Sequence, residues 1–106
     1  MKKGDVVLIP FPFTDLSGNK TRPAIVLAER ESDVIVAFIS TRFHYKEETD
    51  ILILPTSENG LKKDSLIRVS KIATLEKSLV LGRLGALNAA IITQVNEALK
   101  QILQIN

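Results

Sequence analysis

The stretch RPAIVLAERESDVIVAFIST, residues 22–41, contains two apolar runs separated by a charged turn. The runs, residues 23–28 and residues 34–41, are rich in valine, isoleucine and other apolar side chains, which favour buried strands. The charged residues 29–33 connect them. The stretch therefore predicts two consecutive strands of a β-rich fold.

A further strand is expected before this stretch, at residues 6–11, where the run is again β-branched and apolar. Pro10 and Pro12 have no backbone N–H to donate, so this strand should end near them or run along an edge of the sheet. Residues 14–21 are a loop by composition, with Ser-Gly-Asn at its turn.

After the opening stretch the chain alternates between polar and apolar segments. We expect, in order, a loop at residues 42–49, a strand at 50–54, a turn around Asn59-Gly60, a half-exposed strand at 65–72, a short helical turn at 75–81, and glycine punctuation at Gly82 and Gly85.

The C-terminal segment predicts a helix laid over the sheet. Asn88 can cap it, because its side chain can accept a hydrogen bond from an early backbone N–H. The apolar residues recur at helical spacing and form one stripe, which consists of Ile91, Ile92, Val95, Leu99, Ile102 and Leu103.

Five short strands, long loops and a terminal helix indicate a mainly β fold. The arrangement we expect is a small antiparallel barrel, closed to limit exposed strand edges. A half-open sheet with a covering helix fits almost as well. With 106 residues, the chain is expected to form a single domain over residues 1–106.

Composition removes several classes of site. The chain has no cysteine, which excludes disulfides and thiolate zinc sites, and His44 is its one histidine. With no second nitrogen or sulfur ligand beside it, no metal site is expected. The glycine spacing fits neither a phosphate-binding nor a dinucleotide-binding loop, and no cofactor is expected. No apolar run approaches the ~18 residues of a membrane span, and the N-terminus lacks a signal-peptide core. We therefore expect a cytoplasmic protein.

The charge distribution permits a polyanionic partner without demanding one. The net charge is +2, and residues 62–83 carry a local excess of basic side chains. Such a run is more often a solvated face than a binding site.

Polar residues beside the strands are the best candidates for chemistry. Arg22 precedes Pro23, which favours an extended backbone there, and its guanidinium offers a planar fork to phosphate oxygens. Ser40 and Thr41 close the third strand, where hydroxyls can contact phosphate or ribose, and Arg42 follows them. The plainer alternative is that Ser40 and Thr41 cap a turn and that Arg22 pairs with Asp15 or Glu29. Aromatic rings at strand ends and in loops, where they can stack on unpaired bases, are Phe11, Phe13, Phe43, His44 and Tyr45.

Four stretches carry a resemblance that covers nearly the whole chain. They are KKGDVVLIPFPFTDLSGNKTRPAIVLA at residues 2–28, VAFIST at 36–41, GLKKDSLIRVSKIATLEKSLV at 60–80 and LGRLGALN at 81–88. In this order the sequence resembles the MazF/PemK-like toxins of bacterial type II toxin–antitoxin systems. The family shows a Gly-Asp-Val strand, a variable loop, Arg-Pro and an apolar strand, as this chain does.

The resemblance implies a small SH3-like barrel, usually a homodimer, that acts as a metal-independent endoribonuclease on single-stranded RNA. The ribose 2′-OH would attack its own 3′-phosphate and give a 2′,3′-cyclic phosphate and a 5′-OH, with growth arrest as the consequence. The family arginine falls on Arg22. The family's hydroxyl residue, commonly threonine, falls on Ser40, with Thr41 beside it to share or take the role.

The same resemblance, together with residue type, gives further site residues and partners. Ser17 to Lys20 would form a flap over the RNA groove, and His44 is a secondary candidate for proton transfer. The cognate antitoxin would carry an acidic C-terminal tail that competes near Arg22, and promoter DNA would be contacted only through the antitoxin. The residues expected to bind RNA are Phe13, Lys20, Arg42, His44 and Lys71.

Two alternatives stay open from the sequence. The related CcdB-like toxins share the barrel but poison DNA gyrase through the terminal helix region, which would tolerate the loss of Arg22. A module that kept the barrel without catalysis and binds DNA with an antitoxin is the other.

Overall fold

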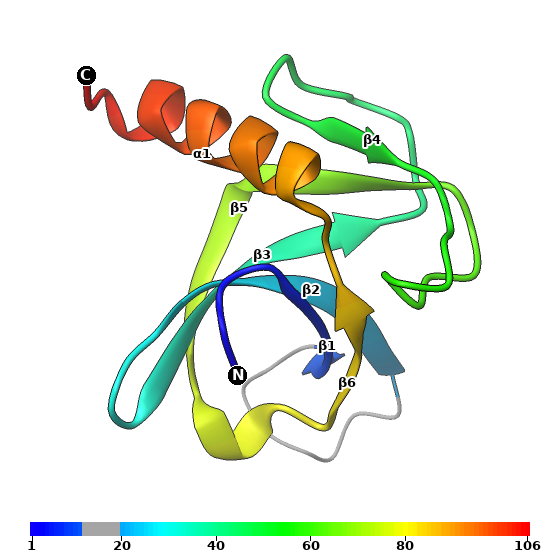
Figure 1. The fold of residues 1–106 in the computed structure, drawn as a ribbon, viewed down its shortest axis with the longest axis vertical. Coiled ribbons are helices and arrows are strands. Elements are labelled where there is room, and N and C mark those ends of the chain that lie inside the picture. The colour runs from blue at the N-terminus through cyan, green and yellow to red at the C-terminus, as the bar shows by residue number, and fades with distance from the viewer. Residues whose placement is uncertain (12–19) are drawn as a thin grey trace.

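The computed structural model describes residues 1–11 and 20–106, which fold as one curled sheet covered by a helix (Figure 1). The sheet has six strands in the order β4-β5-β3-β2-β1-β6, and neighbouring strands are antiparallel. The elements are β1 (Asp5–Phe11), β2 (Lys20–Glu29), β3 (Asp33–Ser40), β4 (Ile51–Ile53), β5 (Ser65–Glu76), the 3-10 turn η1 (Lys77–Leu79), β6 (Gly82–Ala86) and α1 (Ala89–Leu103).

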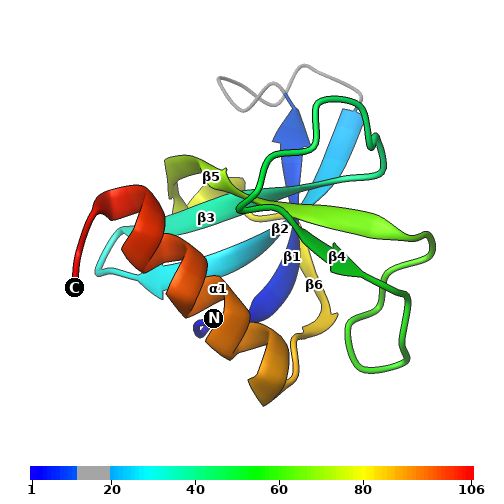
Figure 2. The same cartoon turned by 90° about the horizontal axis from the view of Figure 1, so that it is seen from above.

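The expected mainly β fold with a C-terminal helix is confirmed, and the sheet is a half-barrel with β4 and β6 as its edges. Figure 2 shows β1 crossing β5 at a steep angle as the sheet curls. β-Bulges bend a strand and increase its twist, which explains the curl. Register shifts of this kind lie between Val6 and Val7, between Val26 and Ala28, and between Ala37 and Phe38.

The loop after β4 packs against the β6 edge of the half-barrel. The backbone N–H of Ala86 donates to the carbonyl of Glu58 at 2.8 Å. A Cβ on Gly85 would lie 2.1 Å from that same carbonyl oxygen, so only glycine allows this approach of two backbones. The loop thereby covers the outer edge of β6.

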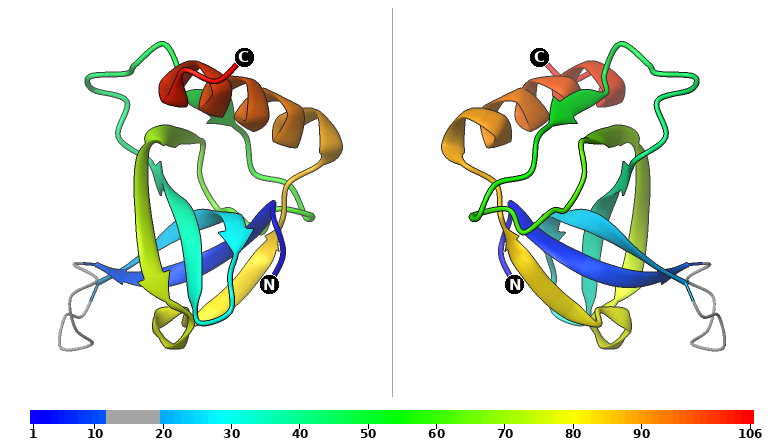
Figure 3. Two further views of the ribbon diagram at one scale, coloured as in Figure 1. Left: turned by 90° about the vertical axis from the view of Figure 1, so that its left-hand side faces the viewer. Right: turned by 90° about the vertical axis from the view of Figure 1, so that its right-hand side faces the viewer.

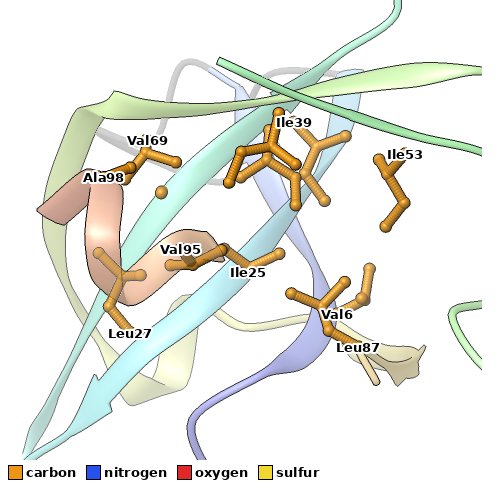
Figure 4. Close-up of a cluster of buried hydrophobic side chains, with 12 residues drawn as sticks. Val6, Ile25, Leu27, Ile39, Ile53, Val69, Leu87, Val95 and Ala98 are labelled. Atoms are coloured by element: carbon orange, nitrogen blue, oxygen red, sulfur yellow. The ribbon is translucent and has the colours of Figure 1, made fainter. Parts of the chain in front are cut away.

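Both faces of the central strands are buried, which is why their sequences are continuous apolar runs rather than alternating ones. On β1, Val6 belongs to a cluster beneath α1, whereas Val7 belongs to a second cluster on the opposite face. Figure 4 shows the first cluster, in which Val95 and Ala98 of α1 pack over Ile25 and its neighbours. Figure 3 shows α1 across one side of the molecule and η1 at the other end.

The helix begins and packs largely as expected. The Asn88 side chain accepts from the backbone N–H of Ile91 at 2.9 Å, which confirms the cap. Leu103 was expected in the buried stripe but is 54% exposed, and Ala98 is buried instead, because the sheet ends before the last turn of the helix. No helix in residues 1–11 and 20–106 has both the length and the apolar character to span a bilayer.

Two expected element boundaries are wrong, and one strand was not expected. β2 begins at Lys20, before the expected start at residue 23, because pairing with β1 continues through polar residues as far as Lys20 opposite Phe11. β5 continues to Glu76, so the helical turn is confined to η1. The sixth strand, β6, was missed because its sequence GRLGA has little strand propensity.

Candidate active site

Arg22 and Ser40 lie at the same end and on the same face of the sheet. The β2–β3 ladder pairs Ala24 with Phe38, and two residues further along lie Arg22 on β2 and Ser40 on β3. Side chains two apart on a strand share a face, so Arg22 follows Ala24 and Ser40 follows Phe38. Ala24 belongs to the second core cluster and Phe38 packs against it, so this cluster anchors the strands just behind the two polar residues.

Pro23 fits this position because its nitrogen faces the side where the β2–β3 ladder has ended. The Val26 carbonyl accepts from Gly4 at 2.9 Å, so the backbone groups of Val26 point toward the β1 side of β2. Backbone N–H and C=O groups point to alternate sides along a strand, so those of Pro23, three residues before Val26, point toward β3. The ladder between β2 and β3 starts only at Ala24, beyond Pro23. The missing N–H therefore breaks no ladder bond, while Arg22 pairs with Ile9 on β1. The strand holds the Arg22 backbone in an extended conformation.

The Ser40 hydroxyl closes the turn that leaves β3. Its Oγ accepts a hydrogen bond from the backbone N–H of Arg42 at 3.0 Å, so Ser40 caps this turn, as the plainer alternative predicts. A hydroxyl that accepts a hydrogen bond keeps its own proton for donation. Ser40 is half-buried, whereas Thr41 and Arg42 are exposed.

His44 lies in the loop between β3 and β4, which begins directly after Ser40. Phe43, His44 and Tyr45 are all exposed. The rings of His44 and Tyr45 are tilted, with centroids 6.5 Å apart.

Arg68 on β5 holds this loop from beneath. Arg68 lies opposite Phe38 in the β3–β5 ladder, so its side chain emerges on the face that carries Ser40. Its Nε lies 3.1 Å from both carboxylate oxygens of Asp50, and its Nη2 lies 3.2 Å from Glu47 Oε1. The Asp50 side chain is fully buried, and Asp50 Oδ2 also accepts from the Glu47 backbone N–H at 2.8 Å. This Glu47–Asp50–Arg68 network fixes the second half of the loop.

Glu47 is the carboxylate that the cations and hydroxyl around it share. Its Oε1 accepts from the Ser70 hydroxyl at 2.9 Å and lies 3.8 Å from Lys71 Nζ. The Ser70 hydrogen bond and the Arg68 guanidinium hold the pKa of Glu47 below its ordinary value of 4.5. Lys71, expected to bind RNA, is therefore already part of an ion pair, although its side chain is 54% exposed.

The structure brings together most of the residues that the sequence singled out. Lys20 and Arg22 begin β2, and Ser40, Thr41, Arg42 and His44 follow one another at the end of β3. Phe13 and the first three residues of the expected flap, Ser17 to Asn19, lie outside the described residues, and Lys20 belongs to β2 rather than to a flap. The alternative pairing of Arg22 with Glu29 is wrong, because Glu29 lies at the other end of β2 and binds Lys77 at 3.1 Å.

Arg68 was missed as a site residue. It lies 18 residues from Asp50 in the sequence, and only the β4–β5 pairing brings the two together. The signal that could have found it is an arginine at a buried stretch of strand, which needs a carboxylate partner. Among residues 1–11 and 20–106, no three histidine, aspartate or glutamate side chains gather in a way that could hold a metal ion.

Comparison with known proteins assigns the family. The sequence matches the model of the PemK-like, MazF-like toxin of type II toxin-antitoxin systems over residues 2–103. It is 28% identical over 92 residues to endoribonuclease MazF6 of Mycobacterium tuberculosis, with 81% of each chain covered.

Two solved structures share the fold. The Mycobacterium tuberculosis toxin MazF-mt6 has a TM-score of 0.77 and 20% identity, covering 96% of this chain and 98% of that one. An endoribonuclease in complex with its cognate antitoxin, from a mycobacterial species, has a TM-score of 0.76 and 20% identity, covering 100% and 97%. Since the family model matches nearly the whole sequence, the chain belongs to the PemK-like, MazF-like toxins of type II toxin–antitoxin systems.

Proposed function

We propose that this chain is a single toxin domain over residues 1–106 that acts as a metal-independent endoribonuclease on single-stranded RNA. The observation that carries the proposal is the position of Arg22 and Ser40, two residues beyond the Ala24–Phe38 pair at one end of the sheet. Membership of the toxin family and the name of its mycobacterial relative, an endoribonuclease, support the same reading.

Residues of these types suit cleavage by the RNA's own 2′-OH. The 2′ oxygen attacks the adjacent phosphorus and loses its proton, and the 5′ oxygen leaves and takes up a proton. The products are a 2′,3′-cyclic phosphate and a 5′-OH, and no metal ion takes part in the balance. The enzyme's task is to align the attack and to stabilise the charge that grows on the phosphorane oxygens.

We assign to Arg22 and Ser40 the stabilisation of the negative charge on the phosphorane oxygens. A guanidinium stays protonated and can contact two phosphate oxygens at once. The Ser40 hydroxyl accepts from the Arg42 N–H, so its proton is available to a phosphate oxygen. Thr41, exposed and adjacent, is the second hydroxyl in reach of the same strand end.

Proton transfer and RNA binding are assigned to the surrounding loop and strand ends. His44 is the candidate for proton transfer, because imidazole is the side chain that exchanges protons near neutral pH. Lys20, Arg42 and Lys71 are exposed cations around the site that would contact the RNA backbone. Phe13, from the sequence alone, would stack on a base.

The test expresses the wild-type chain and Arg22→Ala in cells and maps RNA 5′-OH ends. We expect new ends and growth arrest with the wild type and neither with the variant. Arg30→Ala is the matched control, since Arg30 is an exposed arginine beyond the opposite end of β2. Toxicity that survives in Arg22→Ala without new RNA ends would contradict the proposal.

The proposed partners follow from the family. A cognate antitoxin with an acidic tail would compete with RNA near Arg22, as the cations around the site favour a polyanion. A homodimer, a cytoplasmic location, and contact with promoter DNA only through the antitoxin complete the proposal. Antitoxin binding that leaves RNA binding intact would contradict the shared surface.

The gyrase-poisoning alternative is not favoured. The matching family model is that of PemK-like and MazF-like toxins. A gyrase poison would act through the terminal helix and keep its toxicity in Arg22→Ala, so the same pair of variants separates the two functions.

A further inference from the structure

The tip of the β3–β4 loop presents three consecutive rings to solvent. Phe43 is 46% exposed and Tyr45 is 92% exposed, the highest fraction among the exposed large hydrophobic side chains of the described residues. His44 lies between them and is exposed as well. Aromatic rings with a free face are what unpaired bases stack on.

The backbone at Tyr45 is held in an unfavourable conformation. Its φ is +60°, in the left-handed region that β-carbon-bearing residues adopt rarely. Such a conformation persists where the surrounding structure imposes it, and it is common at ligand-binding sites. The ring is therefore presented by a held loop.

The Glu47–Asp50–Arg68 network supplies the restraint. Arg68 Nη2 reaches the Tyr45 carbonyl at 3.5 Å as well as Glu47, and Arg68 Nε is fixed by the buried Asp50 carboxylate. The Asp50 backbone N–H also donates to the Glu47 carbonyl at 3.1 Å, which closes the turn after the tip. One arginine thus ties the loop to β5 at Tyr45 and along the half of the loop that follows it.

The loop tip belongs to the same face as the candidate active site. The loop leaves β3 directly after Ser40, and Arg68 lies opposite Phe38, the residue two before Ser40. An RNA strand whose scissile phosphate lies at Arg22 and Ser40 would therefore pass the loop with its flanking nucleotides. A loop that is already fixed binds without a further ordering cost.

We propose that Tyr45 stacks on an unpaired base next to the scissile phosphate, and that Arg68 is the positioning residue that holds Tyr45 for this contact. The inference rests on the proposed endoribonuclease function. It assigns to Tyr45 a part of substrate recognition that is separate from the charge stabilisation at Arg22.

The fluorescence of Tyr45 can report on the contact directly, because the chain has one tyrosine and no tryptophan. The probe is a short single-stranded oligonucleotide that spans a mapped cleavage site and carries 2′-O-methyl groups, which prevent cleavage. We expect this oligonucleotide to quench the tyrosine emission in a saturable way, whereas the same sequence in a duplex, whose bases are paired, leaves it unchanged. Free tyrosine amide with the same oligonucleotide corrects for absorption by the bases.

Variants test the contribution to affinity and turnover. Tyr45→Ala should raise KM and Kd about 10-fold with little change in kcat, while Tyr45→Phe keeps the wild-type values, since the stack needs the ring and not the hydroxyl. Leu103→Ala, at an exposed position on α1, is the matched control and should behave as wild type. Arg68→Lys, which loses the planar fork, should raise KM with the thermal transition still present and weaken the quenching. The Tyr45 variants test the proposal even if Arg68→Lys does not fold.

The outcomes separate this inference from the proposed function. Arg22-dependent cleavage with unchanged KM in Tyr45→Ala and no quenching would overturn the stacking role and leave the nuclease standing. A Tyr45→Ala variant that loses antitoxin binding but not RNA binding would also overturn it, because the ring would then serve the antitoxin. If no RNA is cleaved or bound, both proposals fall.

Discussion

At the scale of single residues, the cations of the site differ in how accessible their side chains are. Arg68 forms ion pairs with Asp50 and Glu47 within the fold, and its side chain is only 17% exposed. Lys71 shares Glu47 at 3.8 Å and stays accessible. Arg22 is exposed at the start of β2. Arg22 is therefore the arginine suited to a phosphate, whereas Arg68 is suited to holding the loop.

Glu47 links the site to pH. Its pKa is lowered from the ordinary 4.5, chiefly by the Ser70 hydrogen bond and then by that of Arg68. A carboxyl group whose folded pKa is lowered contributes stability that is present above its unfolded pKa and is lost as the pH falls through the folded pKa. The free energy of unfolding should therefore decline as the pH falls below about 4.5.

Glu47→Gln tests this contribution. The variant should be less stable than wild type at neutral pH and should lose less stability on acidification, as measured by urea unfolding across the acid range. Glu29, whose pKa Lys77 lowers by a hydrogen bond, contributes in the same direction at the far end of β2. Glu29→Gln should add to Glu47→Gln, since distant sites are additive. An unchanged acid slope in Glu47→Gln would contradict the assignment.

At the scale of elements, specific side-chain and backbone contacts fix the two long loops that flank β4. The Arg68 network ties the β3–β4 loop to β5, and a second set of contacts ties the β4–β5 loop to β6. The backbone N–H of Ala86 on β6 donates to the Glu58 carbonyl of this loop at 2.8 Å. Within the loop, the buried Asn59 side chain accepts from the Thr56 and Leu61 backbone N–H groups at 3.1 and 2.9 Å. Gly60 and Gly85 then allow the loop and β6 to touch through their backbones.

Gly85→Ala tests the packing of the β4–β5 loop on β6. The added Cβ would meet the Glu58 carbonyl oxygen at 2.1 Å and the Asn59 carbonyl carbon at 2.7 Å, so backbone must move. We expect a loss of about 1–3 kcal/mol in the free energy of unfolding, the usual cost of overpacking. Gly82→Ala on the same strand is the control, because nothing lies within 4 Å of its Cβ. Equal stability of the two variants in urea unfolding would show that the contact is not tight.

At the scale of the whole molecule, the sequence predicts the central strands and the helix but not how the sheet closes. The continuous apolar runs of β1, β2 and β3 are explained by burial on both faces, and Asn88 marks the helix start. The strand β6 escaped prediction because Gly85 serves a contact with a distant loop, which no local pattern reveals. The half-open form of the sheet was one of the two arrangements expected, whereas the sixth strand was not expected because it depends on long-range pairing.

The same division holds for the site. Arg22 and Ser40 could be proposed from local sequence and family resemblance, because each sits beside a strand that the pattern predicts. That they share a face needed the register of Ala24 with Phe38, and the loop restraint needed the pairing of β5 with β4. The register shifts at β-bulges in the β2–β3 and β3–β5 ladders, and the apolar runs of the sequence do not show where those bulges lie.

The central claim is that Arg22 acts in metal-independent cleavage of single-stranded RNA. The most direct measurement incubates the purified chain with single-stranded RNA in excess EDTA and identifies the product ends by mass spectrometry. The account predicts 2′,3′-cyclic phosphate and 5′-OH ends, with a rate reduced at least about 100-fold in Arg22→Ala and unchanged in Arg30→Ala. Cleavage that stops in EDTA, or that proceeds at the wild-type rate in Arg22→Ala, would contradict it.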